Sequence, residues 1–137
     1  MRVSQRLDYA LRTLVEVARA GGAPVAVGEL ADAMGLPRRF VEQQMTTLAK
    51  HGVVVSKRGS GGGCVLARSA SQTTVGEVVR AIQGTILDVP HTSGSAVAEM
   101  WDRAAETLER RLDSETIAEL VARQEILMRD SSAMYFI

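Results

Sequence analysis

Two adjacent cations, Lys57 and Arg58, stand immediately before the glycine-rich run Gly59-Ser60-Gly61-Gly62-Gly63. Lysine and arginine bind the phosphate oxygens of nucleic acids, and arginine also enters narrow grooves of a duplex. Glycines let the backbone turn sharply and approach a ligand closely. The flanking segments, Val53-Val54-Val55 and Val65-Leu66, are short and rich in β-branched residues. This pattern predicts a two-stranded hairpin with a flexible basic tip that contacts DNA.

Two short helices are expected before this hairpin. The first runs from about Val27 to Met34, with Leu30, Ala31 and Met34 inward, and Gly35 follows it. Leu36-Pro37 opens the second, with proline in the first turn, where its missing N–H does no harm. That helix runs to about Lys50 and stops at Gly52, and its expected inner residues are Phe40, Val41, Met45, Leu48 and Ala49. Two helices joined by a tight glycine turn predict a helix-turn-helix, and the hairpin after it predicts a winged helix.

Further helices flank this unit. Ser4 caps a first helix that ends near Gly21-Gly22, and Thr73 or Thr74 caps a fourth, with Glu77 as its capping-box partner. Ser114 is expected to cap a short last helix, and the chain closes on an apolar tail, residues 134–137. A long helix should begin near Ala96, with an apolar seam that suits another helix: Val97, Trp101, Ala104, Leu108 and Leu112. A dimer seam is favoured over packing against the chain's own first domain.

Composition bounds the function. The 137 residues fit one domain or one domain with an extension, and no apolar run is long enough to span a membrane. With no signal-peptide pattern at the N-terminus, a cytoplasmic protein is expected.

The charge is unevenly distributed along the chain. Residues 1–68 hold ten Lys/Arg and five Asp/Glu, a net charge of +5, whereas residues 69–137 hold six and eleven, a net charge of −5. The basic half is the expected partner of an anion. No catalytic motif supports an enzyme.

The chain resembles the IscR/NsrR/CymR-type bacterial transcription regulators, the Rrf-two (Rrf2) family. The resemblance spans Met1 to about Val121 and is strongest in the wing. Its motifs are Tyr9-Ala10, Phe40-Val41-Glu42-Gln43, Gly52-Val53-Val54, Ser56 to Gly63, Leu66-Ala67, Val75-Gly76-Glu77-Val78, Trp101, Leu112, Ile117 and Glu119-Leu120-Val121. It implies a homodimer that binds partly palindromic double-stranded operators. The third helix would enter the major groove and the wing the adjacent minor groove.

The expected DNA contacts combine this resemblance with residue chemistry. Arg38 and Arg39, in the first turn of the third helix, could bond guanine or clamp a phosphate, with ordinary surface charge as the alternative. Glu42 matches a family position that reads bases, because a carboxylate accepts from cytosine. Tyr9 is either a phosphate contact or a core residue. The predicted DNA-binding residues are Ser4, Arg6, Arg38, Arg39, Glu42, Gln43, Lys57, Arg58, Gly59 and Ser60, with Gln44, Thr46 and Thr47 weaker.

One departure from the family concerns its iron–sulfur sensor. Relatives typically carry three cysteines in the connector before the long helix, whereas Leu87 to Ser95 here contains none. Because cluster ligation needs several thiolates, no cofactor is expected, and the lone His91 is weak evidence for a metal. The only cysteine, Cys64, excludes an intrachain disulfide. It is either a small apolar filler or a redox candidate whose thiol pKa is lowered by nearby cations.

The sequence thus predicts a mainly α fold with a small β-wing. Residues 1–84 form the winged helix-turn-helix domain, 85–95 a connector, and 96–137 a dimerisation helix, a short final helix and the tail. The favoured function is a homodimeric, sequence-specific DNA-binding transcription regulator, and repression is favoured over activation. Its signal would be Cys64 oxidation, a small-molecule ligand or a protein effector. The alternative is a winged-helix scaffold that acts mainly through protein docking by its acidic half.

Overall fold

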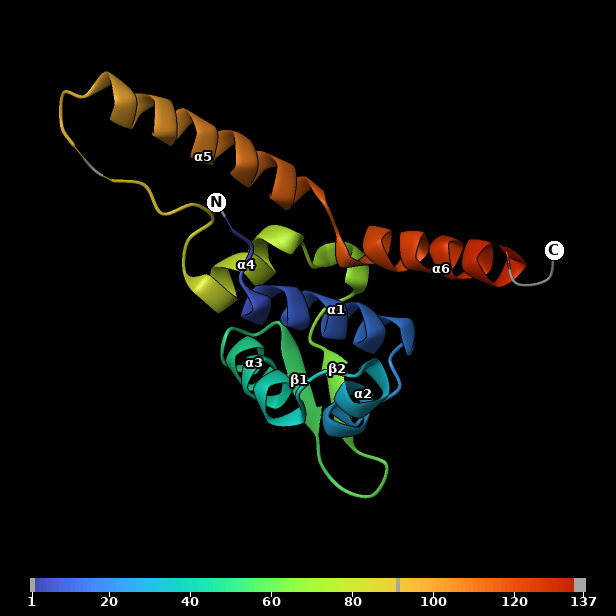
Figure 1. The fold of residues 1–137 in the computed structure, drawn as a ribbon. Helices are drawn as coiled ribbons and strands as arrows, with labels where there is room; N and C mark the ends of the chain where they lie inside the picture. Colours follow the sequence, from blue (N-terminus) through green and yellow to red (C-terminus); the bar gives the residue numbers. More distant parts are fainter. Residues whose placement is uncertain (1, 91, 135–137) are drawn as a thin grey trace.

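A computed structural model describes residues 2–90 and 92–134, with side chains to residue 132 (Figure 1). It is mainly helical with one two-stranded antiparallel sheet, as predicted. His91 and most of the apolar tail lie outside the described residues. The elements in chain order are α1 (Gln5–Arg19), α2 (Val27–Met34), α3 (Arg38–Lys50), β1 (Val54–Lys57), β2 (Gly63–Leu66), a 3-10 turn (Ala70–Gln72), α4 (Val75–Gln83), α5 (Ala96–Ser114) and α6 (Ile117–Met134).

The first helix, α1, crosses the middle of the molecule (Figure 1). Ser4 caps it as predicted, and its hydroxyl accepts from the Leu7 amide at 3.1 Å. The helix packs against α2, α3, α4, α6 and the wing strand β2, and its side chains Leu7, Ala10, Leu14 and Val17 are buried. It is therefore the element around which the core is assembled.

The helix-turn-helix forms as predicted. Gly35 ends α2 in the left-handed region, at φ +69°, and the Leu36 amide donates to the Ala31 carbonyl at 2.9 Å. Pro37 stands one residue before α3 rather than in its first turn, because its extended ψ of 114° places it at the N-cap.

The inner face of α3 differs from the prediction at two positions. Val41, Met45 and Leu48 are buried, but Ala49 is exposed. Ala49 follows Leu48 by one residue, so it lies about 100° further round the helix, away from this apolar stripe. Gln44 takes an inner position instead, and its Nε2 donates to the Phe40 carbonyl at 3.4 Å. A buried glutamine tolerates this position because its amide has a partner.

The wing pairs β1 with β2 in a register that sets Ser56 opposite Cys64 and Lys57 opposite Gly63. Val25, in the link before α2, adds two backbone hydrogen bonds to Cys64, of 3.0 and 2.7 Å. A Cβ on Gly63 would overlap the Val25 backbone, so glycine permits this close approach. The base of the wing is thereby attached to the segment that leads into α2.

Thr74 caps α4: its hydroxyl accepts from the Glu77 amide at 3.2 Å. A capping box would also have the Glu77 carboxylate accept from the Thr74 backbone amide. Here that carboxylate accepts from Arg68 instead. Thr73, the other candidate cap, is buried and donates to the Ser69 carbonyl at 3.0 Å.

Two predictions for the last helix were wrong. Thr116 caps α6 by accepting from the Glu119 amide at 3.1 Å, whereas the Ser114 hydroxyl donates to the Arg111 carbonyl within α5. The helix is also long, with 18 residues, since no glycine or proline interrupts its good helix formers. Ile117 is fully buried in the common core, and α6 lies against α1 (Figure 1). The C-terminal region thus contributes to the core of the winged-helix domain.

Candidate nucleic-acid interface

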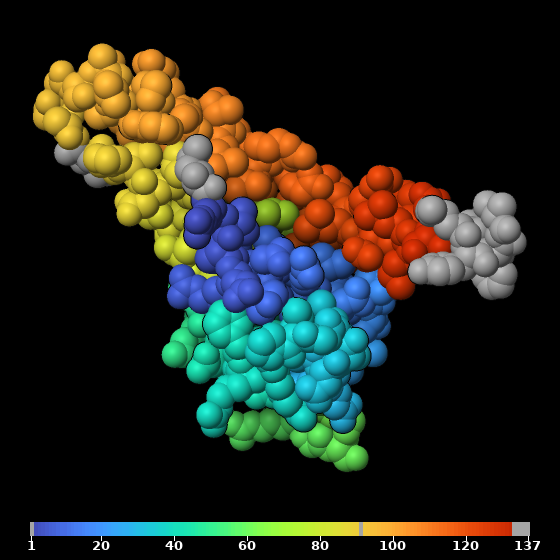
Figure 2. All heavy atoms as spheres, in the orientation of Figure 1, coloured from blue at the N-terminus to red at the C-terminus, as the bar shows by residue number. Residues whose placement is uncertain are grey.

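The α2–α3 pair and the wing lie at one end of the molecule, and α5 lies at the other (Figure 2). Apart from the three weaker candidates on α3, all the predicted contact residues are exposed except Ser4, which is half-buried. The exposed set is Arg6, Arg38, Arg39, Glu42, Gln43, Lys57, Arg58, Gly59 and Ser60. Side chains of this kind are available to phosphates and base edges without any change of fold.

Tyr9 and Phe40 fix the start of α1 against the start of α3. Their rings meet edge to face, with centroids 5.8 Å apart and planes at 88°. Both side chains are half-buried. Of the two roles predicted for Tyr9, the structure shows packing. The Tyr9 ring holds the first turn of α3 in place through Phe40.

Arg38 lies between two carboxylates. Its Nη1 donates to Asp32 on α2 and its Nε donates to Glu42 on α3, both at 3.4 Å. All three side chains are half exposed or more, so water screens the pairs and their contribution to stability is small. Their geometric effect is larger, because they orient the two predicted base readers relative to α2.

Asp32 was not among the predicted site residues. It precedes Arg38 by six residues across the Gly35 turn, a separation that no single-helix spacing rule covers. The pairing becomes visible only when the turn brings α2 against α3.

Other polar side chains of α3 bond to the backbone of their own helix. Thr46 and Thr47 donate to the carbonyls of Glu42 and Gln43, at 3.0 and 3.2 Å. His51 is the C-cap residue, and its Nδ1 lies 2.9 Å from the Thr47 carbonyl. Buried Gln44 faces the core and so cannot read bases in this arrangement.

The wing tip carries the most accessible cations. Lys57 and Arg58 are exposed and form no ion pair within the described part of the chain, whereas Arg68, at the base of the wing, pairs with Glu77. Gly59 and Gly61 adopt φ values of +99° and +76°, which a side chain would disfavour. The tip therefore presents its charges on a backbone that only glycine follows without strain.

The prediction that nearby cations lower the pKa of the Cys64 thiol was wrong. The side chain is only 6% exposed and belongs to the common core. Burial raises the pKa of the Cys64 thiol, because a low-dielectric environment disfavours the thiolate. This environment matches a small apolar filler rather than a reactive redox residue.

The chain's residues do not fit an iron–sulfur cluster. The connector has no cysteine, and Cys64 is buried on the wing strand. Across residues 2–90 and 92–134, no three His, Cys, Asp or Glu side chains gather as a metal site would require. No cofactor chemistry is therefore assigned to this chain.

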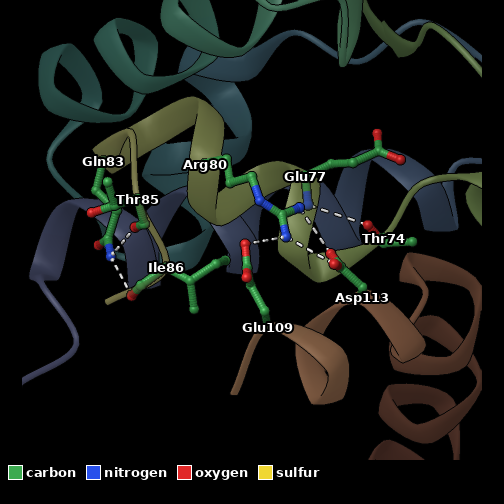
Figure 3. Close-up of polar contacts among 8 residues, drawn as sticks. All are labelled: Thr74, Glu77, Arg80, Gln83, Thr85, Ile86, Glu109 and Asp113. Atoms are coloured by element: carbon green, nitrogen blue, oxygen red, sulfur yellow. Dashed lines mark hydrogen bonds and ion pairs between the residues drawn. The ribbon is translucent and has the colours of Figure 1, made fainter. Parts of the chain in front are cut away.

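An ion-pair cluster attaches α5 to α4 (Figure 3). Arg80 donates to both carboxylate oxygens of Asp113, at 2.9 and 2.8 Å, and to Glu109 at 3.1 Å. These hydrogen bonds raise the pKa of Arg80 and lower the pKa of Asp113. A Cβ on Gly76 would overlap the Asp113 carboxylate, so glycine permits this approach. The cluster sets the direction in which α5 leaves the domain.

The outer face of α5 is apolar and exposed. Of the predicted seam residues, Val97 is 61% exposed and Leu108 37%, Ala104 is exposed, and Trp101 and Leu112 are half-buried. Met100, 44% exposed, extends the same stripe. A different face of the helix, with Ala98, Ala105 and Glu109, turns toward the body. The predicted seam residue Leu112 belongs to this inner face, because it packs against the common core.

The connector borders a small cavity. An open pocket of about 340 Å³ lies between the end of α4, the connector and α5, with Arg80, Ile86, Leu87, Val89 and Glu109 in its wall. Trp101 is not part of this wall. No helix among the described residues has both the length and the apolar character needed to cross a bilayer.

Comparisons of the sequence and of the fold with known proteins agree on one family. The profile of Rrf2, described as an iron-dependent transcriptional regulator, matches residues 3–123. The HTH-type transcriptional regulator IscR of Sodalis glossinidius is 31% identical over 93% of this chain and 82% of that protein. The fold matches CymR of B. subtilis with a TM-score of 0.80, 28% identity and coverage of 90% and 98%. It matches T. potens IscR with a TM-score of 0.77, 29% identity and coverage of 90% and 88%.

These relatives are transcription regulators rather than enzymes, and the match covers both the winged helix and the C-terminal helices. The chain belongs to the Rrf2 family of winged-helix transcriptional regulators.

Proposed function

We propose that this chain is a homodimeric, sequence-specific DNA-binding repressor. In this proposal, α3 enters the major groove and reads bases through Arg38, Arg39, Glu42 and Gln43. Lys57 and Arg58 reach the adjacent minor groove with Gly59 and Ser60, while Ser4 and Arg6 contact the backbone. The observation that carries the proposal is the gathering of α3 and a basic wing at one end of the fold.

The proposed dimer uses the apolar stripe of α5. Val97, Met100, Ala104 and Leu108 are exposed on one side of a 19-residue helix. Such a stripe, at steps of three and four residues, fits a second helix of the same kind. A twofold pair of winged helices would bind two half-sites, which explains why a partly palindromic operator is expected. Repression requires only that the dimer occupy this operator.

The signal proposed here is not a cluster and not oxidation of Cys64. A small-molecule ligand in the cavity beside the connector is the favoured effector. That cavity includes Arg80 and Glu109, two members of the cluster that directs α5. A ligand there would alter the angle between the DNA-binding domain and the dimer helix.

Binding of duplex DNA at several salt concentrations tests the proposal. The protein should select a partly palindromic sequence from a library of duplexes with a randomised centre. The logarithm of its binding constant should fall linearly with the logarithm of the salt concentration. Equal binding to selected and scrambled duplexes would contradict sequence-specific regulation. Binding to neither would favour the alternative, a scaffold that docks proteins through its acidic C-terminal half.

A further inference from the structure

Gly28, in the first turn of α2, needs its lack of a side chain for reasons of space. Its φ is not in the left-handed region, so the backbone does not require glycine. Glycine within a helix costs about 1 kcal/mol relative to alanine. Gly28 is also buried, although it lies on a helix near the protein surface. A feature of the surroundings must therefore account for glycine here.

The ends of Arg38 and Glu42 occupy the space that a Cβ would need. A methyl group built on Gly28 would overlap the Arg38 guanidinium and would lie 2.6 Å from Glu42 Oε1. Both side chains come from α3 and are joined to each other at 3.4 Å. Asp32, one turn after Gly28 on α2, holds the other side of the same guanidinium at 3.4 Å. The Arg38–Glu42 pair thus packs directly over the Gly28 backbone, and Asp32 contacts the guanidinium from α2.

We propose that Gly28 and Asp32 are positioning residues for base recognition: they set the orientation in which Arg38 and Glu42 meet the DNA. This inference rests on the proposed function, since it assumes that α3 reads bases. A bidentate arginine or an accepting carboxylate discriminates bases through its direction, so a small displacement changes which bases are preferred. Neither Gly28 nor Asp32 needs to touch the DNA for this effect.

The Gly28→Ala variant separates positioning from folding. The atoms that the new methyl group meets are the ends of flexible, half-exposed side chains, which can move without unfolding the protein. Its melting temperature should equal or exceed that of the wild type. Its discrimination between bases should fall roughly five- to tenfold at the base pairs that Arg38→Ala and Glu42→Ala also affect. Asp32→Asn should shift preference at the same base pairs, because it weakens the other hold on Arg38.

Gly76→Ala is the matched control. It adds the same methyl group at a helical glycine beside a charged pair, but at the α4–α5 contact. It should leave unchanged the preference at the base pairs that Arg38→Ala and Glu42→Ala affect; any effect of this variant should fall on the spacing between half-sites, because the α4–α5 contact directs α5. In the Arg38→Ala/Glu42→Ala background, adding Gly28→Ala should have no further effect on preference, because the side chains it displaces are gone.

Binding-site selection from the randomised duplex library gives separable outcomes. Absence of base preference in the wild-type protein would overturn the proposed function itself. A selective wild type, with Arg38→Ala or Glu42→Ala altering preference but Gly28→Ala and Asp32→Asn not, would overturn the positioning role alone. A Gly28→Ala effect that persists in the double-alanine background would also overturn it, since the substitution would then act through the fold.

Discussion

Tyr9 contacts Phe40 edge to face at a centroid distance of 5.8 Å, and this contact joins the N-terminal half of α1 to the first turn of α3. One partner is on the helix that organises the core and the other is on the helix proposed to read DNA. The position of α3 therefore depends on an aromatic pair at its N-terminal end as well as on buried Val41 and Leu48. Arg38 and Glu42 lie in the same part of α3, so the aromatic contact also helps to fix their backbone positions.

Removing one ring of this pair should destabilise the protein. Phe40→Ala is expected to lower the free energy of unfolding by about 2 kcal/mol, because a half-buried aromatic side chain and its edge contact are lost. Tyr9→Phe keeps both rings and should change it by less than about 0.5 kcal/mol. Urea denaturation measures both values. Equal stability of Phe40→Ala and the wild type would mean that α3 is held by its buried face alone.

Arg58 should contribute sequence-independent attraction. Arg58→Ala is expected to weaken binding to selected and scrambled duplexes by similar factors and to reduce the salt slope by about one, since one phosphate contact is lost. Arg129→Ala, which removes an exposed arginine from α6, is the charge-matched control and should have little effect on either quantity. Fluorescence anisotropy titrations at increasing salt measure the slope. A loss confined to one sequence would instead assign Arg58 to base reading.

Charge introduced on the outer face of α5 should prevent dimer formation. Leu108→Glu places a carboxylate in the proposed seam, where its desolvation is not compensated, so sedimentation should report a monomer. Arg110→Glu introduces the same side chain on the opposite side of the helix and should not change the mass. A Leu108→Glu protein that sediments like the wild type would exclude this face as the seam.

The Cys64 thiol should be unreactive in the folded protein. With burial raising its pKa, alkylation by iodoacetamide near neutral pH should be slow until the protein unfolds. Cys64→Ser should cost about 1–2 kcal/mol of stability, because a hydroxyl enters an apolar site. Mass spectrometry with and without urea follows the alkylation. Rapid labelling of the native protein would restore Cys64 as a redox candidate.

Acid should weaken the attachment of α5. Hydrogen bonding from Arg80 lowers the pKa of Asp113 in the folded protein, so the unfolded state binds the proton more readily. The resulting stabilisation is complete above the ordinary aspartate pKa of about 3.9 and is lost as the pH falls through the lower, folded value. Its size should stay below about 1 kcal/mol, because both groups are partly exposed.

Asp113→Asn provides the comparison for this acid effect. The variant should be less stable than the wild type at pH 6, and the difference should shrink below pH 4, as thermal melts across this range would record. A difference that is independent of pH would mean that the carboxylate charge at Asp113 does not contribute.

The sequence by itself determined the local elements and the chemistry they present. Ser4, Thr74, Gly35 and Gly52 mark helix ends through short-range caps and left-handed turns, and these rules act within a few residues. The basic glycine-rich tip likewise followed from residue types alone, because an exposed hairpin tip depends little on distant contacts. These signals were sufficient to predict the winged helix, and the family followed from the resemblance of its motifs.

Only the tertiary structure decided how these parts act on one another. Burial of Cys64 against the core reversed the expected direction of its pKa shift. The Gly35 turn brought Asp32 and Gly28 against Arg38, and the close approach of α5 at Gly76 allowed Arg80 to reach Asp113, 33 residues away. Contacts between residues this distant in the chain depend on how whole helices pack, which local spacing does not specify.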